Sequence, residues 1–191
     1  MAFVGMKHPV WAPIREEIEG QPVVYDTGLV IGEAISADVT FTRSNNPLYA
    51  DDKLSESDNS ITGGTVSLTV NEIEDATLAK IMDMGVGADG EYEETSNPSP
   101  YGGLGYMRAR RKKGKTTYTA MWLHKVQLGI TSETATTKGE QIDYQTPTLE
   151  GNMMGVVNDS DMKTKYRSRK TFETEAEAIA WLDAKAKVVS A

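Results

Sequence analysis

Two segments of strictly alternating polarity, at residues 34–42 and 66–70, constrain the fold more than any other feature of this sequence. In each segment every second side chain is apolar, and the side chains between them are polar. Alternation with a period of two is typical of a strand that packs one face on a core. The pattern predicts a mainly β protein, and Gly32 predicts a bulge or a close backbone approach before the first strand. The apolar positions are Ile35, Ala37, Val39 and Phe41, and then Val66, Leu68 and Val70.

The segment between these strands, at about residues 43–64, is rich in Asn, Asp, Ser and Gly. Hairpin connections usually take about 2–5 residues, so this segment is far too long for an ordinary turn. We interpret it as a long inter-strand loop. A loop of that length is typical of a disordered or a binding segment.

The rest of the chain predicts further strands and two helices within one domain over residues 1–191. Residues 105–128 predict a long hairpin whose turn is centred on Gly114. A helix is expected from Ile73, with Gly85 as its stop. A C-terminal helix is expected to start at a capping box made by Thr174 and Glu177. The side chains expected to share one face of the returning hairpin strand are Tyr118, Ala120, Trp122, His124 and Val126.

Composition narrows the classes of function. The net charge of −8 argues against general nucleic-acid affinity, which needs a basic surface. The absence of cysteine excludes disulfides and cysteine-based metal sites, and the two histidines lie far apart in the sequence. No apolar run is long enough for a membrane span, and the N-terminus lacks a signal-peptide pattern. We therefore expect no cofactor, no metal and no membrane.

Motifs with catalytic meaning are lacking. Asp51 and Asp52 are adjacent, so in a strand their carboxylates would point to opposite faces and could not share a proton. The acidic segment around them does not match the calcium-loop pattern. No serine sits in a nucleophile elbow, and no glycine-rich loop precedes a helix. These absences predict a protein that is not an enzyme.

The strongest charge cluster lies at the predicted hairpin turn. Three interpretations stay open: a nucleic-acid contact, a charged strand edge that prevents unwanted pairing, and a contact with an acidic patch on a neighbouring subunit. Because the whole chain is acidic, the last two fit its composition better than the first. The basic residues of the cluster are Arg108, Arg110, Arg111, Lys112, Lys113 and Lys115.

Three segments in order resemble the major tail proteins of long-tailed bacteriophages, in particular the phi13-type group. They are Val4-Gly-Met-Lys-His-Pro-Val-Trp-Ala-Pro-Ile, Leu48-Tyr-Ala-Asp-Asp52 and Tyr144-Gln-Thr-Pro-Thr-Leu-Glu-Gly151. Each segment alone is a weak signal, whereas their order and spacing agree over nearly the whole chain. The resemblance implies a β-sandwich or β-barrel tail-tube fold with one flanking helix, and the C-terminal helix adds a second.

The resemblance also implies a function. Such proteins form hexameric rings that stack into a hollow tube, and the tube carries genomic DNA from the capsid into the host without specific binding. It implies a virion protein of the tail, assembled in the host cytoplasm, with tape measure, tail terminator and distal tail proteins as partners. In that family the long loop reaches the adjacent ring. The residues expected at such contacts are Leu48, Tyr49, Asp51, Asp52 and Lys53, together with the basic cluster at the hairpin turn.

Other readings remain open at the level of sequence. A monomeric β-sandwich module that binds carbohydrate or a cell surface would keep the alternating strands but would not form rings. A tail-derived bacteriocin would use the same tube without a virus.

If the protein forms a tube and its acidic residues line the bore, DNA, a polyanion, would pass without adhesion.

Overall fold

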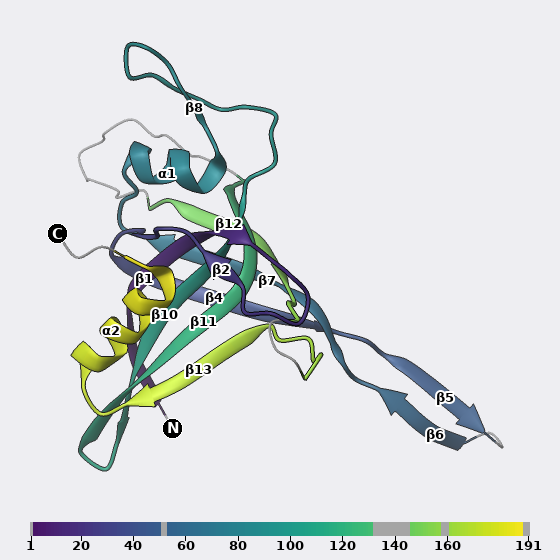
Figure 1. The fold of residues 1–191 in the computed structure, drawn as a ribbon. Coiled ribbons are helices and arrows are strands. Elements are labelled where there is room, and N and C mark those ends of the chain that lie inside the picture. The colour runs from purple at the N-terminus through teal and green to yellow at the C-terminus, as the bar shows by residue number, and fades with distance from the viewer. Residues whose placement is uncertain (1, 51–52, 132–145, 158–160, 189–191) are drawn as a thin grey trace, which may run out of the picture.

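A computed structural model describes residues 2–50, 53–131, 146–157 and 161–188. Within these residues the chain forms thirteen strands and two helices (Figure 1). The strands are β1 (Ala2–Glu16), β2 (Val24–Tyr25), β3 (Leu29–Val30), β4 (Ala34–Arg43), β5 (Asn46–Ala50), β6 (Lys53–Asp58), β7 (Ile61–Val70), β8 (Gly85–Val86), β9 (Tyr92–Glu93), β10 (Tyr101–Lys112), β11 (Lys115–Ile130), β12 (Thr148–Met154) and β13 (Arg167–Phe172). The helices are α1 (Asp75–Met82) and α2 (Glu175–Ala186).

Nine of the described strands form one antiparallel sheet in the order β2-β1-β10-β11-β12-β7-β4. β13 pairs with β11 beside β12, and β3 pairs with β1. Two small hairpins, β5–β6 and β8–β9, lie outside this sheet. The architecture confirms the predicted mainly β fold with two helices. The alternating segments occupy adjacent strands, because β4 pairs with β7 over most of its length.

The interpretation of residues 43–64 as a loop was wrong. β5 and β6 pair from Asn46 with Asp58 to Ala50 with Lys53, so the segment is a hairpin that continues β4 and β7. The sequence hides these strands because the segment is mostly polar and has no apolar residue at every second position. Apolar alternation reports burial of one face, and a hairpin outside the core does not need it.

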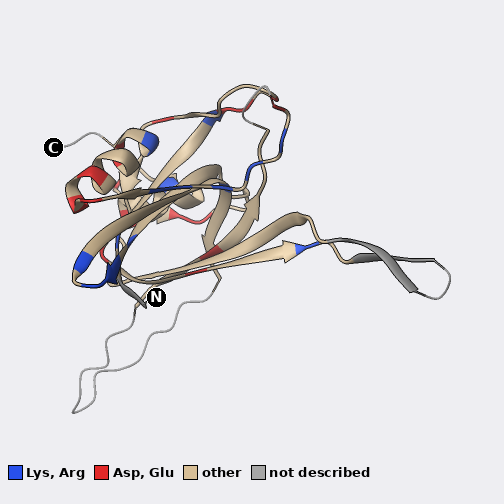
Figure 2. Cartoon of the chain, turned by 90° about the horizontal axis from the view of Figure 1, so that it is seen from below, with Lys and Arg blue, Asp and Glu red and all other residues tan. Residues whose placement is uncertain are grey.

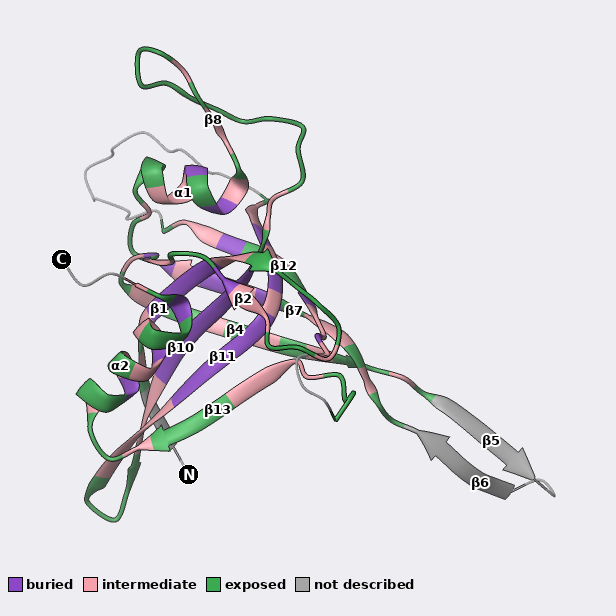
Figure 3. Cartoon of the chain, viewed as in Figure 1, coloured by how far each residue is buried: buried purple, intermediate pink, exposed green. Residues whose placement is uncertain are grey.

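The sheet curls around one core and carries a second core on its outer face (Figure 3). Side chains from β1, β7, β10, β11 and β12 meet in the first core, and α1 contributes Ile81 to it. The second core lies beneath α2, whose Ala178, Leu182 and Ala186 are fully buried. The buried residues of the first core are Trp11, Ile31, Val66, Leu68, Val70, Ile81, Leu104, Leu123, Val126, Leu128, Leu149 and Met153.

A bulge in β11 divides its side chains between the two cores. Gly102 pairs with Val126 and Leu104 pairs with Leu123, so β11 has one residue more than β10 in this interval. An extra residue shifts the following side chains to the other face of the sheet. Val126 therefore lies in the first core and Trp122 in the second. The prediction of one shared face was wrong for Val126.

A second irregularity lies at the start of β4. Ala34 pairs with Val70 and Ser36 pairs with Thr69, which leaves Ile35 as the additional residue. The side chain of Ile35 is 53% exposed, although the alternation predicts a core position. The three apolar residues that follow it in β4 do pack against the first core.

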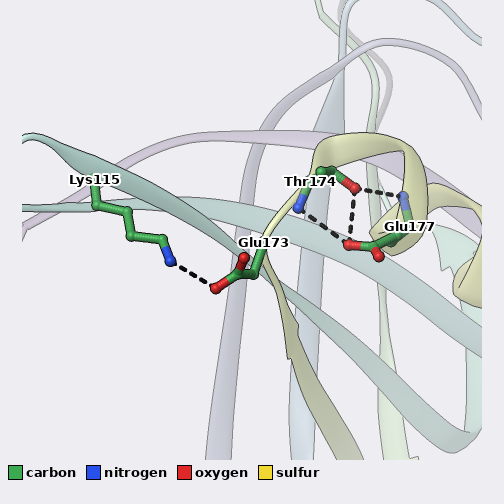
Figure 4. A network of polar contacts seen from close by, with 4 residues as sticks. All are labelled: Lys115, Glu173, Thr174 and Glu177. Carbon is green, nitrogen blue, oxygen red and sulfur yellow. Dashed lines mark hydrogen bonds and ion pairs between the residues drawn. The ribbon is translucent and has the colours of Figure 1, made fainter.

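Both helices end at a residue in the left-handed conformation, Asp83 after α1 and Lys187 after α2, but only α2 begins with a side-chain cap. The last turn of α1 is followed by Asp83 in the left-handed conformation, with φ of 55°, so the predicted stop at Gly85 was wrong. Gly85 instead begins β8. The predicted capping box of α2 is confirmed: Thr174 Oγ1 accepts from the Glu177 N–H, and Glu177 Oε2 accepts from the Thr174 N–H (Figure 4). These bonds satisfy donors that a helix start leaves unpaired.

Replacing Thr174→Ala should lower the free energy of unfolding by about 1 kcal/mol, because the cap loses its hydroxyl acceptor. Glu173→Gln is a matched control one residue away. Glu173 forms an ion pair with Lys115 at 2.6 Å, and both side chains are mostly exposed, so its loss should change stability little. Urea denaturation of the two variants measures the difference. Equal losses would mean that the cap stabilises this end of α2 no more than the exposed ion pair does.

His124 lies on β11, and its side chain is buried. Its Nε2 lies 2.9 Å from Ser168 Oγ, and its carbonyl accepts a hydrogen bond from the Tyr25 hydroxyl at 2.8 Å. Burial, together with the nearby positive charges of Lys185 and Lys165, lowers the pKa of His124 to about 4. The imidazole is therefore neutral in the folded protein at pH 7 and must take up its proton on unfolding at lower pH.

Stability should fall as the pH is lowered from the unfolded-state pKa of 6.5 towards 4, since only the unfolded state binds the proton in that window. This difference in pKa between the unfolded and folded states corresponds to a loss of about 3 kcal/mol in the free energy of unfolding between pH 7 and pH 4. The variant His124→Gln keeps a polar side chain and removes the titration. Between pH 7 and pH 4 its free energy of unfolding should therefore fall by about 3 kcal/mol less than that of the wild type, as measured by urea denaturation at each pH. Parallel curves for the two proteins would contradict the assignment.

Candidate assembly surfaces

The hairpin β5–β6 projects from the body of the molecule as an arm, which we define by its two strands, residues 46–50 and 53–58 (Figure 1). The Ser44 N–H donates to the Ser60 carbonyl at 2.8 Å and closes the ladder at its base. At about 3.4 Å per residue, the strands of the arm add about 17–20 Å to β4 and β7. A two-stranded hairpin is marginally stable alone in water, so an arm of this kind gains most from packing on another molecule.

The predicted contact residues of this region fall on the arm. Leu48 and Tyr49 belong to β5, and Lys53 belongs to β6. Asp51 and Asp52 lie outside the described residues, so their predicted contacts stay a prediction. The backbone places all three described positions near the far end of the arm, where Ala50 pairs with Lys53.

The turn between β10 and β11 is a tight one. Lys112 pairs with Lys115, and the two residues between them, Lys113 and Gly114, have φ of 47° and 82°. Positive φ at both central residues is the signature of a type I′ turn, which fits the twist of the flanking strands. The predicted hairpin and its turn at Gly114 are confirmed. Residues 111–115 are called the basic tip below.

The charges of the hairpin differ in their surroundings. Arg111 to Lys113 are exposed, and Figure 2 shows a concentration of basic residues at this turn. Lys115 is held by the ion pair with Glu173 of the same chain. Arg108 and Arg110 lie further from the turn and are half-buried. The freely presented cations of the tip are therefore those of Arg111 to Lys113.

The structure does not bring the arm and the basic tip together within one copy. Figure 1 shows them at different ends of the molecule. An interaction between the acidic arm sequence and the tip, as the sequence predicts, would have to form between two copies.

A cleft of about 910 Å³ was not predicted from the sequence. It lies between the irregular part of β1, the turn that leads into β4, the start of α1 and one side of α2. Apolar side chains line part of it, among them Met6, Val30, Ile31, Met107 and Ile179. Val30 is 41% exposed, so part of this apolar lining is open to solvent. We call this feature the acidic cleft, for the charges described next.

The lining of the cleft also includes four glutamates and only one lysine. Glu175 forms an ion pair with that lysine, Lys7, at 2.9 Å, and the bond raises the pKa of the Lys7 ammonium. The described residues place no lysine or arginine within ion-pair distance of Glu33, Glu72 or Glu74. The cleft therefore combines an apolar lining with negative charge that the described part of its own copy does not neutralise.

Two local features hold the walls of the cleft in place. A bulge in β1 puts His8 in a left-handed conformation, with φ of 57°, and its Nε2 lies 2.7 Å from Asp183 Oδ1 on α2. On the other wall the predicted close approach at Gly32 is confirmed, because a Cβ there would lie 2.4 Å from the Glu72 carbonyl oxygen. No local pattern in the sequence predicted the cleft as a whole, because its walls come from positions as far apart as Met6 and Ile179.

In the described part of the chain, no three His, Asp or Glu side chains gather as metal ligands. No helix among the described residues is long and apolar enough to cross a membrane. No family model matches the chain, and no curated protein is significantly similar to it.

Proposed function

We propose that this protein is a tail tube subunit, which forms rings that stack into a hollow conduit for genome delivery. The single observation that carries the proposal is the arm, a hairpin that continues two strands of the sheet beyond the body of the molecule (Figure 1). An arm of this geometry can reach a neighbouring copy without any change in the sheet that holds it. The ring and the tube are inferred from the sequence resemblance to major tail proteins.

Open strand edges support assembly by strand pairing. Among the described strands, β4 pairs only with β7 and β13 only with β11, so each leaves one edge unpaired. Unpaired edges are a liability in a monomer and become joints when an identical molecule adds its own strand. A heterologous contact of this kind gives a ring when its rotation closes.

The polar outer face of β4, β7, β12 and β11 suits the bore. This face is hollowed by a groove of about 600 Å³ with hydroxyl and amide side chains such as Thr40, Ser67 and Asn152. Asp38 and Glu150 add carboxylates, and the residues that line the groove include no lysine or arginine. Such a surface would repel DNA weakly and let it slide.

Stacking of the rings is assigned to the arm. The proposed contact residues are Leu48, Tyr49, Asp51, Asp52 and Lys53, with the basic cluster of the hairpin as a second contact region. One exposed ion pair contributes only about 0–1 kcal/mol, so the stack depends on repetition of the contact around each ring. In this proposal the tape measure, tail terminator and distal tail proteins bind the tube, and DNA transits it without specific binding.

Negative-stain electron microscopy of the purified protein over a range of concentrations tests this function, with analytical ultracentrifugation on the same samples. Rings or tubes of uniform diameter are the expected result. A monodisperse monomer under all conditions, including low salt and high concentration, would contradict the proposal and favour a monomeric β-sandwich binding module.

A further inference from the structure

We propose that the basic tip of one copy docks in the acidic cleft of a neighbouring copy. The inference rests on the proposed self-assembly and goes beyond it by naming a pair of surfaces that meet. The tip contributes Arg111 and Lys112, and the cleft contributes Glu72 and Glu74 beside the start of α1.

Charge complementarity is the first argument. Glu72 and Glu74 are exposed and have no lysine or arginine of the described residues within ion-pair distance. Arg111 and Lys112 are exposed as well, on a turn that presents them together. Complementary charges across an interface fix its register and accelerate encounter.

The apolar lining of the cleft is the second argument. Arginine and lysine carry long apolar stems below their charged heads, and such stems pack on apolar surface while the heads stay at a polar rim. The cleft offers that arrangement, with Met6, Val30 and Ile179 beside the glutamates. A small cation or an anion would leave the apolar lining unused, whereas a basic hairpin of this chain uses both parts.

The position of the two surfaces makes the contact intermolecular. In Figure 1 the tip lies at the opposite end of β10 and β11 from α1 and points away from it. Glu72 and Glu74 immediately precede α1, so the tip of the same copy cannot reach them. Because the tip and the glutamates at the start of α1 lie on different parts of one molecule, their contact between copies is heterologous, which links copies in a series and can close a ring.

Charge exchange tests the contact directly. One variant carries Glu72→Lys and Glu74→Lys in the cleft, and the other carries Arg111→Glu and Lys112→Glu in the tip. These tip positions avoid the left-handed Lys113 and the intrachain ion pair of Lys115. Each variant alone should raise the concentration needed for assembly about tenfold or more at low salt, as several attractive pairs become repulsive. A 1:1 mixture should restore assembly, because each reversed surface then meets its complement.

A matched control carries Glu91→Lys and Glu94→Lys, which make the same change of net charge at exposed positions outside the cleft lining. The control should assemble as the wild type does. A mixture that does not recover would overturn the inference, and so would rescue of the reversed tip by Asp51→Lys and Asp52→Lys instead, which would assign the tip to the arm. If the wild type forms tubes while both reversed variants also form them, the cleft contact fails and the proposed function stands. A wild type that never associates overturns both.

Discussion

Replacement of residues 45–59 by an Asn-Gly turn should abolish tube formation and leave the folded subunit intact. The hydrogen bond from the Ser44 N–H to the Ser60 carbonyl marks the point where β4 and β7 are still adjacent, so a tight turn can join them there. In Figure 1 the backbone of the arm projects beyond the sheet and both helices, so the sheet should keep its packing. Assembly should be lost because the element proposed to reach the next ring is gone.

Electron microscopy at several times the wild-type assembly concentration measures the loss. Circular dichroism and thermal denaturation of the same sample serve as the control for folding, and the melting temperature should stay close to that of the wild type. Tubes at the wild-type yield would remove the arm from the mechanism. A truncated protein that no longer folds would instead show that the arm supports the sheet.

The variant Trp122→Ala should lower the free energy of unfolding by about 3–5 kcal/mol. The indole of Trp122 is fully buried in the second core and meets the Tyr25 ring edge to face, with centroids 5.1 Å apart. Its Nε1 donates to the Tyr25 hydroxyl at 3.2 Å. The chain makes room for it with Gly103 and Gly105, where a Cβ would lie 2.2 Å and 2.7 Å from indole carbons. Removal of the ring therefore leaves a large cavity and a lost hydrogen bond.

Urea denaturation measures this effect, with Trp181→Ala as the matched control. Trp181 lies on α2 at the border of the same core and is only half-buried, so its loss should cost clearly less. Trp122→Phe should recover part of the difference, because the ring fills most of the cavity. Equal losses for the two alanine variants would show that the core closes around the missing ring.

The predicted elements that proved right are those whose signal is local. Alternation reported β4 and β7 because each rests one face on the first core. The turn at Gly114 and the capping box of Thr174 and Glu177 were found because specific residue types satisfy specific backbone needs. These features require no knowledge of the remaining chain.

What the sequence did not predict depends on partners distant in the chain. The bulge in β11 is visible only against the register of β10, and it moves Val126 to the other core. The arm lacks apolar alternation, and its backbone runs outside the sheet that surrounds the first core (Figure 1). The acidic cleft brings Glu33 and α2 to the same hollow as Glu72 and Glu74, and no local pattern in the sequence predicts that meeting.

The continuity of the arm with β4 and β7 has a mechanical consequence. In Figure 1 the arm extends along the direction of the strands that carry it. A pull on the arm along its length therefore loads the ladder between β7 and β12 in shear, with six residue pairs sharing the force. Ladder hydrogen bonds lie across the strands and would have to break together under such a load, whereas peeling would break them one at a time. A tube joined through such arms would resist stretching along the direction in which the strands run.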